Sequence, residues 1–222
     1  MAALKKVLSW IWPLPVKRVE GKLTAVLEVT YEQGKKVLNA GEVNYSFGAL
    51  HAVFRIALQK ANIIESPPAE VLILGFGAGS IASILVEEFG QHPRITGIEA
   101  DAVVVQLARQ EFNIGRFSAL EIENTTAEKF ISACPAKFDL IAVDVFIESR
   151  VPESCKSHAF LENLYRCLTK NGRVVFNEMP EAQVLAENEF VARFRNNFDE
   201  TEIHELHVGG SPNRILIGYR RK

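Results

Sequence analysis

From residue 70 onward, short apolar segments alternate with segments whose apolar residues recur at helical spacing. The apolar segments span residues 70–76, 94–100, 119–124, 138–145 and 173–179. Strands that are apolar along their whole length are covered on both faces, and strands separated by helices run parallel within one sheet. This alternation therefore predicts an α/β fold with a doubly wound, mostly parallel sheet and helices on both faces.

Each of these strands is followed by a segment that we expect to be helical. Asp101 is expected to cap the second helix, Asn171–Gly172 to end the fourth and Pro180 to start the last. The expected helices span residues 79–90, 101–112, 125–133, 157–169 and 180–198. The alternation of strands and helices then ends, because residues 200–208 and 214–220 are strand-like with no helix between them. They add a C-terminal antiparallel strand, so we expect seven strands in all.

The N-terminal part has a different pattern. Residues 22–33 and 37–47 are strand-like and flank a turn at 34–36, which predicts a β-hairpin, and a helix is expected over 48–62. Pro67–Pro68 mark a boundary. We therefore divide the chain into residues 1–66, with the hairpin and lead-in helix, and residues 67–222, with the α/β domain.

The composition excludes several classes of protein. A net charge of −2 over 222 residues predicts no nucleic-acid partner, and Arg220–Lys222 reads as a solvated tail. No apolar stretch approaches a membrane span, and the run over 7–16 is short and holds two prolines, so we expect neither a signal peptide nor a membrane partner. The three cysteines show no paired spacing, which predicts reduced thiols in a cytoplasmic protein.

A glycine-rich turn joins the first strand of the α/β domain to its helix. Its sequence is Gly75-Phe76-Gly77-Ala78-Gly79. Glycines allow positive φ angles and let backbone N–H groups approach a ligand at the start of a helix. Because such sheets bind ligands outside the carboxyl ends of their strands, this loop is a candidate cofactor-binding element.

Glu99 ends the next strand, 20 residues after Gly79. A carboxylate at this place accepts hydrogen bonds from both hydroxyls of an adenosine ribose, each worth about 1.5–3 kcal/mol when charge-assisted. The loop and Glu99 fit either a nicotinamide dinucleotide or S-adenosylmethionine. Ser80 leaves the GxGxxG pattern of dinucleotide sites incomplete, and the closing hairpin is foreign to their usual topology, so S-adenosylmethionine is favoured.

The order of these motifs resembles that of class I S-adenosylmethionine-dependent methyltransferases, over about residues 68–220. The resemblance implies that residues 67–222 form a Rossmann-like, S-adenosylmethionine-binding domain. In such a domain Glu99, with Ala100 beside it, would hold the ribose, and Thr126 and Ala127 would flank the adenine. Asp144, after the fourth strand, would lie where cofactor and substrate meet.

A narrower resemblance is to spermidine synthases, which are aminopropyltransferases that use decarboxylated S-adenosylmethionine. The hairpin, "GFGAG", "GIEAD" and "FDLIAVDV" carry it, over about residues 22–180. That family follows the fourth strand with a D-S-S-D-like run, in which the first Asp helps to activate the amine and the second holds a polyamine nitrogen. Asp144 matches the first, but Ile147 stands at the second, and Thr126 stands where the family has an adenine-binding Asp.

An ammonium group that is desolvated without a partner costs several kcal/mol, so the apolar run Val145–Ile147 argues against a polyamine pocket. We therefore expect an S-adenosylmethionine-binding transferase, a methyltransferase of a small molecule, with Asp144 as catalytic base or orienting group. Two alternatives stay open. One is an aminopropyltransferase with an unusual amine acceptor, and the other is a non-catalytic ligand-binding or scaffold protein that kept the fold.

Tyr45, at the end of the hairpin, and Phe146 are the expected substrate contacts. No metal site is expected, because the three-residue spacing of His204 and His207 on a strand points them to opposite faces. An N-terminal hairpin of this kind often pairs between subunits, so a homodimer is expected.

Overall fold

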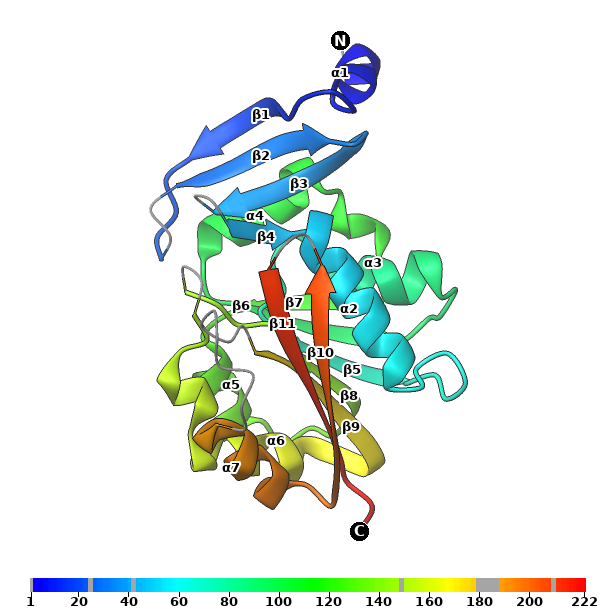
Figure 1. Ribbon diagram of the computed structural model, residues 1–222, viewed down its shortest axis with the longest axis vertical. Coiled ribbons are helices and arrows are strands. Elements are labelled where there is room, and N and C mark those ends of the chain that lie inside the picture. Colours follow the sequence, from blue (N-terminus) through cyan, green and yellow to red (C-terminus); the bar gives the residue numbers. More distant parts are fainter. Residues whose placement is uncertain (1, 24–25, 41–42, 148–149, 179–187, 209–210) are drawn as a thin grey trace.

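The computed structural model describes residues 2–23, 26–40, 43–147, 150–178, 188–208 and 211–222. Figure 1 shows a large sheet with helices packed on it, and a smaller sheet at the end that carries the N-terminus. In the described part of the chain, no helix is long and apolar enough to cross a membrane.

The large sheet has seven strands in the order β10-β11-β9-β8-β5-β6-β7. Strand β11 runs antiparallel to both of its neighbours, and the pairs among the other strands are parallel. This confirms the predicted fold class. The strands are β5 (Glu70–Leu74), β6 (Arg94–Glu99), β7 (Leu120–Asn124), β8 (Phe138–Val143), β9 (Leu168–Glu178), β10 (Glu200–Val208) and β11 (Ser211–Tyr219).

Helices cover both faces of this sheet (Figure 1). One face packs against α2 (Gly48–Lys60), α3 (Ser80–Ser83) with the π-helical turn η1 (Ile84–Glu88), and α4 (Ala102–Glu111). The other face packs against α5 (Ala127–Ala133), α6 (His158–Cys167) and α7 (Glu189–Asn197). Two short 3₁₀ turns, η2 (Ile114–Arg116) and η3 (Glu153–Lys156), complete the helical elements.

The small sheet has the order β1-β2-β3-β4 and follows the short helix α1 (Ala2–Leu8). Its strands are β1 (Leu14–Val19), β2 (Leu27–Glu32), β3 (Lys35–Ala40) and β4 (Val43–Ser46). The β2–β3 pair confirms the predicted hairpin, but the expected second strand, 37–47, divides into two antiparallel strands. The sequence also gave no sign of β1, whose Pro15 lies beside a register shift on an edge strand, where proline is tolerated.

The predicted end of the fourth helix is wrong. Helix α6 ends at Cys167, and Asn171–Gly172 lie inside β9, opposite a register shift in β8. Asn171 adopts a φ of 64°, and its N–H donates to the carbonyl oxygen of Arg220 at 2.7 Å. A turn-like pair thus forms a bulge because the C-terminal strand provides hydrogen-bond partners, which local sequence does not reveal.

The last helix is shorter than the predicted 180–198. Helix α7 starts at Glu189, after Asn188, whose side-chain oxygen accepts a hydrogen bond from the N–H of Val191 at 2.9 Å. The predicted start at Pro180 lies outside the described residues. The other predicted helices are present, whereas α1 was not predicted. The Asp101 side chain caps α4 as expected, at 2.8 Å from the N–H of Val103.

The two predicted parts share one apolar cluster. Leu27, Val29 and Leu38 of the small sheet belong to the same buried cluster as Val71 and Ile73 of β5. The small sheet is therefore fixed to the α/β body by apolar packing, and the boundary at residue 67 stays a prediction.

Candidate cofactor and acceptor site

The candidate site lies where the strand order reverses. Strand β5 has β6 and β7 on one side and β8 and β9 on the other, so β5 and β8 form the switch point of the sheet. The N–H of Asp144, just after β8, donates to the carbonyl oxygen of Leu74 at the end of β5, at 2.8 Å. Ligands of open α/β sheets bind in this crevice.

A cavity of about 160 Å³ opens at this edge. It brings together seven of the predicted site residues: Gly75, Glu99, Ala100, Thr126, Ala127, Asp144 and Phe146. The remaining lining residues, which the sequence did not single out as ligand contacts, are Leu23, Ile98, Thr125, Glu128, Val145, Ile147 and Pro152. The volume is below the ~300–1,000 Å³ of drug-sized pockets, so the cavity suits part of a nucleoside-sized ligand rather than all of it.

The glycine loop needs its glycines for backbone reasons. Gly75, Gly77 and Gly79 have φ angles of 82°, 57° and 93°, which L side chains rarely adopt. A Cβ on Gly75 would lie 2.2 Å from the carbonyl oxygen of Asp144. The close approach of the loop to the residue after β8 is therefore possible only with glycine at this position.

Phe76 and Ala78 do not reach the cavity. Both side chains are buried in the core, where Phe76 packs so tightly under Gly97 that a Cβ there would lie 2.5 Å from its ring. Gly77 and Gly79 do not line the cavity either. As cofactor contacts, these predicted loop residues can contribute only main-chain groups.

Glu99 is 3% exposed and is held by the backbone. One carboxylate oxygen accepts from the N–H of Gly77 at 2.9 Å and the other from the N–H of Asp101 at 3.0 Å. Burial raises the pKa of Glu99, while these hydrogen bonds and that of Ala100 act in the opposite direction. These backbone bonds hold the carboxylate at the edge of the cavity, which it lines.

The N-terminal segment reaches the cavity through Asp101. One oxygen of its carboxylate accepts from the N–H groups of Lys22 and Leu23, at 2.7 and 3.0 Å, while the other caps α4. This places Leu23 on the cavity wall although it lies far from the other lining residues in sequence. No sequence signal pointed to Leu23, because the pattern identified Asp101 only as a helix cap.

Thr126, the residue at the place of the family's adenine-binding Asp, is the N-cap of α5. Its side-chain oxygen accepts from the N–H of Lys129 at 3.3 Å. Its hydroxyl also donates a hydrogen bond to the carboxylate of Glu128. The Glu128 carboxylate accepts a second hydrogen bond from Ser154. Burial raises the pKa of Glu128, but these hydrogen bonds lower it, and the net shift is downward.

Asp144 keeps some surface open to the cavity, but protein atoms surround its carboxyl group. Burial raises its pKa to about 7, assisted by the negative charge of Glu99, while a hydrogen bond from Asn177 acts in the opposite direction. The donor is Nδ2 of Asn177, at 3.1 Å from Oδ1 of Asp144. A carboxyl group with this pKa can gain and lose a proton near neutral pH.

Asn177 is a site residue that the sequence did not reveal. Its side chain is fully buried, and its Oδ1 atom has no hydrogen-bond partner among the described residues. The next residue, Glu178, points to the opposite face and forms a buried ion pair with Arg214 at 3.2 Å. Asn177 follows the apolar run Val174–Phe176, and only the β8–β9 pairing, with Val143 opposite Phe176, shows that it lies beside Asp144.

Beyond Asp144 the wall becomes apolar. We call Leu23, Val145, Phe146, Ile147 and Pro152 the apolar side of the cavity, and Gly75, Glu99, Ala100, Thr126 and Ala127 the polar side. Leu23 and Ile147 are 51% and 49% exposed, so this side offers apolar surface to a ligand. The predicted substrate contact Phe146 lies on the apolar side; the side chain of Tyr45 lies outside the described residues.

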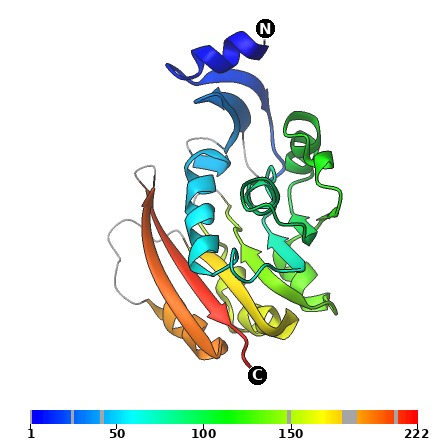
Figure 2. The same cartoon turned by 90° about the vertical axis from the view of Figure 1, so that its right-hand side faces the viewer.

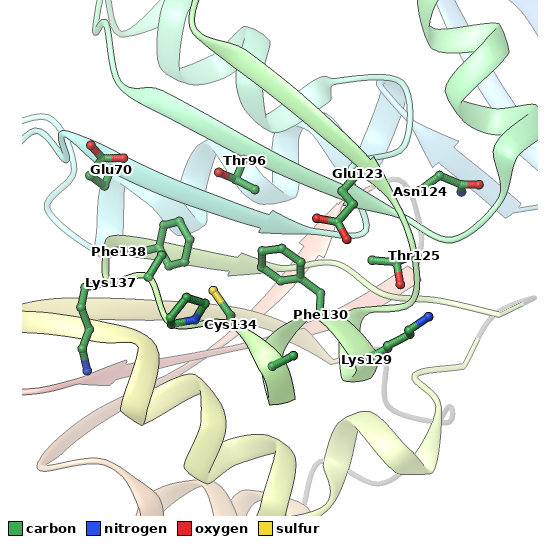
Figure 3. Close-up of a pocket in the computed structure, with 13 residues that line it drawn as sticks. Glu70, Thr96, Glu123, Asn124, Thr125, Lys129, Phe130, Cys134, Lys137 and Phe138 are labelled. Carbon is green, nitrogen blue, oxygen red and sulfur yellow. The ribbon is translucent and has the colours of Figure 1, made fainter.

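A larger hollow, of about 560 Å³, lies elsewhere (Figure 3). It is bounded by the starts of β5 and β8, the end of β7 and helix α5, and Glu123 and Phe130 point into it (Figure 3). None of the predicted site residues lines it. It shares Thr125 with the candidate cavity, but its other lining residues are not those of the switch point, so its size does not make it the candidate site.

The residues present fit an adenosyl cofactor. The glycine cradle, the buried Glu99 and the Thr126–Ala127 segment surround the cavity as such a ligand requires. In the part of the chain that the structure describes, no group of three or more His, Cys, Asp or Glu residues is arranged to bind a metal ion.

Comparison with known proteins agrees with this geometry. Residues 66–212 match the family model described as a methyltransferase domain, and the chain belongs to that family. It is 27% identical, over 167 residues, to a polyamine aminopropyltransferase of Vibrio vulnificus, an alignment that covers 73% of this chain and 54% of the relative. It is 24% identical, over 145 residues, to the eEF1A lysine and N-terminal methyltransferase homolog of Drosophila melanogaster, covering 62% of this chain and 21% of the relative. The chain thus spans about half, or less, of the length of these relatives.

Solved structures show the same fold. A probable spermidine synthase from Corynebacterium glutamicum superposes with a TM-score of 0.77 at 22% identity, covering 92% of this chain and 80% of that one. Human methyltransferase-like protein 13 in complex with SAH gives a TM-score of 0.63 at 19% identity, covering 78% and 83%. The fold is that of class I S-adenosylmethionine-dependent methyltransferases of the spermidine synthase type, and the chain is a transferase of this general type by family.

Proposed function

We propose that the protein is an S-adenosylmethionine-dependent methyltransferase whose acceptor is a small molecule with an apolar group. The observation that supports it most directly is the contrast between Asp144 and its neighbours. A buried carboxyl group with a pKa of about 7 stands beside Val145, Phe146 and Ile147. Among the described residues of the apolar side, none carries a charge, so the wall beside Asp144 offers no second carboxylate to a polycation.

When bound, S-adenosylmethionine supplies a methyl group on a positively charged sulfonium. Glu99 would hold the ribose, the Gly75–Gly79 backbone would lie along the amino-acid part, and Thr126 and Ala127 would flank the adenine. Asp144 would accept the proton that the acceptor loses, with Asn177 fixing its carboxyl group. Positioning and proton transfer of this kind contribute much of the rate in displacement reactions.

The apolar side indicates the nature of the acceptor. Leu23 and Ile147 leave about half of their surfaces exposed at the cavity rim. A ligand that covered them would gain ~25 cal/mol for each Å² of apolar surface removed from water. The methylene chain of a diammonium such as putrescine could contact this surface, but its second charge would lose hydration there without gaining a partner.

The test combines binding and turnover. Calorimetry should show binding of S-adenosylmethionine and S-adenosylhomocysteine, with weaker binding of decarboxylated S-adenosylmethionine. Incubation with putrescine and decarboxylated S-adenosylmethionine should give no aminopropyl product. Formation of that product would overturn the proposal, and failure of all three ligands to bind would favour a non-catalytic protein that kept the fold.

The second candidate is an aminopropyltransferase with an unusual amine acceptor. The specific observation in its favour is the small N-terminal sheet. The superposition on the probable spermidine synthase covers 92% of this chain, and so extends beyond the α/β body into the N-terminal part. Asp144 would then activate an amine that carries its apolar part against Phe146. Turnover of a monoamine with an apolar tail, but not of putrescine, would distinguish this candidate.

A further inference from the structure

Six large apolar side chains are exposed at the N-terminal end of the molecule. In the described part of the chain, nine large hydrophobic residues are markedly exposed, and six of them lie between residues 4 and 12. We call these six the N-terminal patch: Leu4, Val7, Leu8, Trp10, Ile11 and Trp12, with exposed fractions from 46% to 84%. They belong to helix α1 and the turn after it, at one extremity of the molecule (Figure 2).

The apolar stripe of α1 faces away from the protein. Leu4, Val7 and Leu8 lie three and four residues apart, so they share one face of the helix. The apolar face of a surface helix normally packs against the core. Here these three side chains are exposed, and the residue buried next to them is the polar Ser9. This inverted arrangement indicates that the stripe has a partner outside the chain.

Backbone hydrogen bonds hold the patch in place. The carbonyl oxygen and the hydroxyl of Ser9 accept from the N–H groups of Gln33 and Gly34, both at 2.9 Å, which fixes the segment on the β2–β3 turn. The N–H of Trp12 donates to the carbonyl oxygen of Leu8 at 3.3 Å. The patch is therefore a preformed surface, which loses little conformational freedom when a partner covers it.

The border of the patch is positively charged. The chain has a net charge of −2, yet residues 1–19 contain four basic residues and no acidic one. The basic residues are Lys5, Lys6, Lys17 and Arg18. Lys6 is exposed on α1, and the exposed Lys35 lines one groove with Trp10. Because Glu32 is the one acid among the described residues that line this groove, basic residues outnumber acidic ones around the patch.

We propose that the N-terminal patch binds an anionic lipid surface and lies in the interface of the bilayer, with the α/β body in water. Tryptophan side chains are enriched at the boundary between membrane and water, and anionic headgroups attract basic residues that flank an apolar surface. For lipid-anchored proteins, one apolar chain gives marginal binding, and a second signal such as a basic patch makes it stable. The N-terminal patch and its border supply both signals.

The shape and place of the patch fit a flat surface. Helix α1 and β1 lie at one end of the elongated molecule, so a bilayer can approach them without meeting the α/β body (Figures 1 and 2). At their observed exposures, the two indoles alone offer on the order of 200–350 Å², given ~150–250 Å² for a whole aromatic side chain. Helix α1 has seven residues, about two turns, so it can lie in the interface but cannot span the membrane.

Interfacial binding needs no membrane-spanning segment. The sequence predicts no membrane partner because it holds no apolar stretch of spanning length, a criterion that does not apply to a surface patch. A second protein is the competing occupant. Its surface would have to match the shape of six projecting side chains, whereas lipid adapts to any convex surface. The basic border adds an attraction that is general for anionic lipid.

Vesicles of phosphatidylglycerol and phosphatidylcholine in equal parts provide the test. The full chain should co-sediment with them, and its partition coefficient should fall when phosphatidylglycerol is omitted or the salt concentration is raised. Trp10 and Trp12 are the two tryptophans of the chain and both lie in the patch, so binding should shift tryptophan emission to the blue. Brominated phosphatidylcholine in the vesicles should quench this emission.

Substitutions separate the apolar and the electrostatic contributions. Ile11→Asp and Trp12→Ala should each lower the partition coefficient at least about tenfold, because the first brings a charge to the lipid and the second removes apolar surface. Lys6→Glu should lower it about fivefold or more and should weaken its dependence on salt. These three side chains are exposed, so circular dichroism should show an unchanged fold.

Ile64→Asp and Lys222→Glu are the matched controls, because they make the same changes at exposed positions outside the patch, and both should partition as the wild type does. A wild type that does not co-sediment with phosphatidylglycerol vesicles would overturn the proposal, whether or not another protein chain covers the patch. Co-sedimentation without a blue shift, or equal partitioning of the Ile11→Asp variant, would also overturn it. The proposal is independent of the proposed function, since neither readout uses activity.

Discussion

The polar side and the apolar side of the cavity meet at Asp144 but are built by different means. On the polar side, Gly75 and Glu99 are fixed by main-chain geometry, with the Glu99 carboxylate held by two N–H groups. On the apolar side, Leu23 and Ile147 project side chains that stay about half exposed. The polar side thus matches what an adenosyl group requires, whereas the apolar side would contact the acceptor in the proposed function.

The largest effect is expected at the residue where the two sides meet. Asp144→Asn should lower turnover by about 10²–10⁴-fold, since an amide cannot accept the proton from the acceptor. Binding of S-adenosylhomocysteine should change little, because the polar side is intact. Steady-state rates would measure turnover, and calorimetry would measure binding. Normal turnover of the variant would show that Asp144 takes no part in the reaction.

Thermal unfolding provides the control for that variant. Burial raises the folded-state pKa of Asp144 to about 7 from 3.8, so the folded state binds the proton more tightly than the unfolded state. The contribution of Asp144 to stability is therefore lost as pH rises from about 4 to 7. Asp144→Asn should have a higher Tm than the wild type at pH 8 and a similar Tm at pH 4, and a lower Tm at pH 8 would contradict this.

The next effect tests the polar side. Glu99→Ala should weaken binding of S-adenosylmethionine by at least about tenfold, through the loss of charge-assisted hydrogen bonds worth ~1.5–3 kcal/mol. Glu123→Ala, at the exposed end of the neighbouring strand, is the matched control and should bind normally. Equal affinities of the two variants for S-adenosylmethionine, measured by calorimetry, would contradict the assignment of Glu99 to the ribose.

A substitution on the apolar side should make it more similar to a polyamine site. Ile147→Asp restores a carboxylate at the place where spermidine synthases hold a polyamine nitrogen, and it should strengthen putrescine binding about tenfold. Ile64→Asp adds the same charge at a remote exposed position and should have no effect. Titration of putrescine into both variants, with S-adenosylhomocysteine present, would compare them, and equal affinities would show that the apolar side does not contact the acceptor.

The smallest effect concerns pH. A sulfonium near Asp144 favours the ionised carboxylate, whereas the neutral sulfur of S-adenosylhomocysteine does not. Because the pKa of Asp144 is about 7, the affinity for S-adenosylmethionine relative to S-adenosylhomocysteine should rise a few-fold between pH 6 and pH 8. Calorimetry at the two pH values would measure the ratio, and the Asp144→Asn variant should show no such change.

Much of the fold could be predicted because periodic apolar patterns and helix caps act locally. The seven-stranded sheet, the Asp101 cap and the β2–β3 hairpin all depend on residues close in sequence. The bulge at Asn171–Gly172 could not be predicted, since the same residues commonly end helices and only their pairing with Arg220 decides the outcome. Strand β1 was missed because its prolines obscure a pattern that an edge strand tolerates.

The sequence by itself determined the order of the strands and helices, and with it the positions of Gly75, Glu99 and Asp144 at the ends of their strands. These follow from side-chain periodicity and from the rule that parallel strands present their carboxyl ends at one edge. Only the tertiary structure decided that Asp101 brings Leu23 to the cavity, that Asn177 faces Asp144, and that burial shifts the Asp144 pKa to about 7. Those features depend on contacts between residues distant in sequence and on the exclusion of water, neither of which is encoded in any short segment.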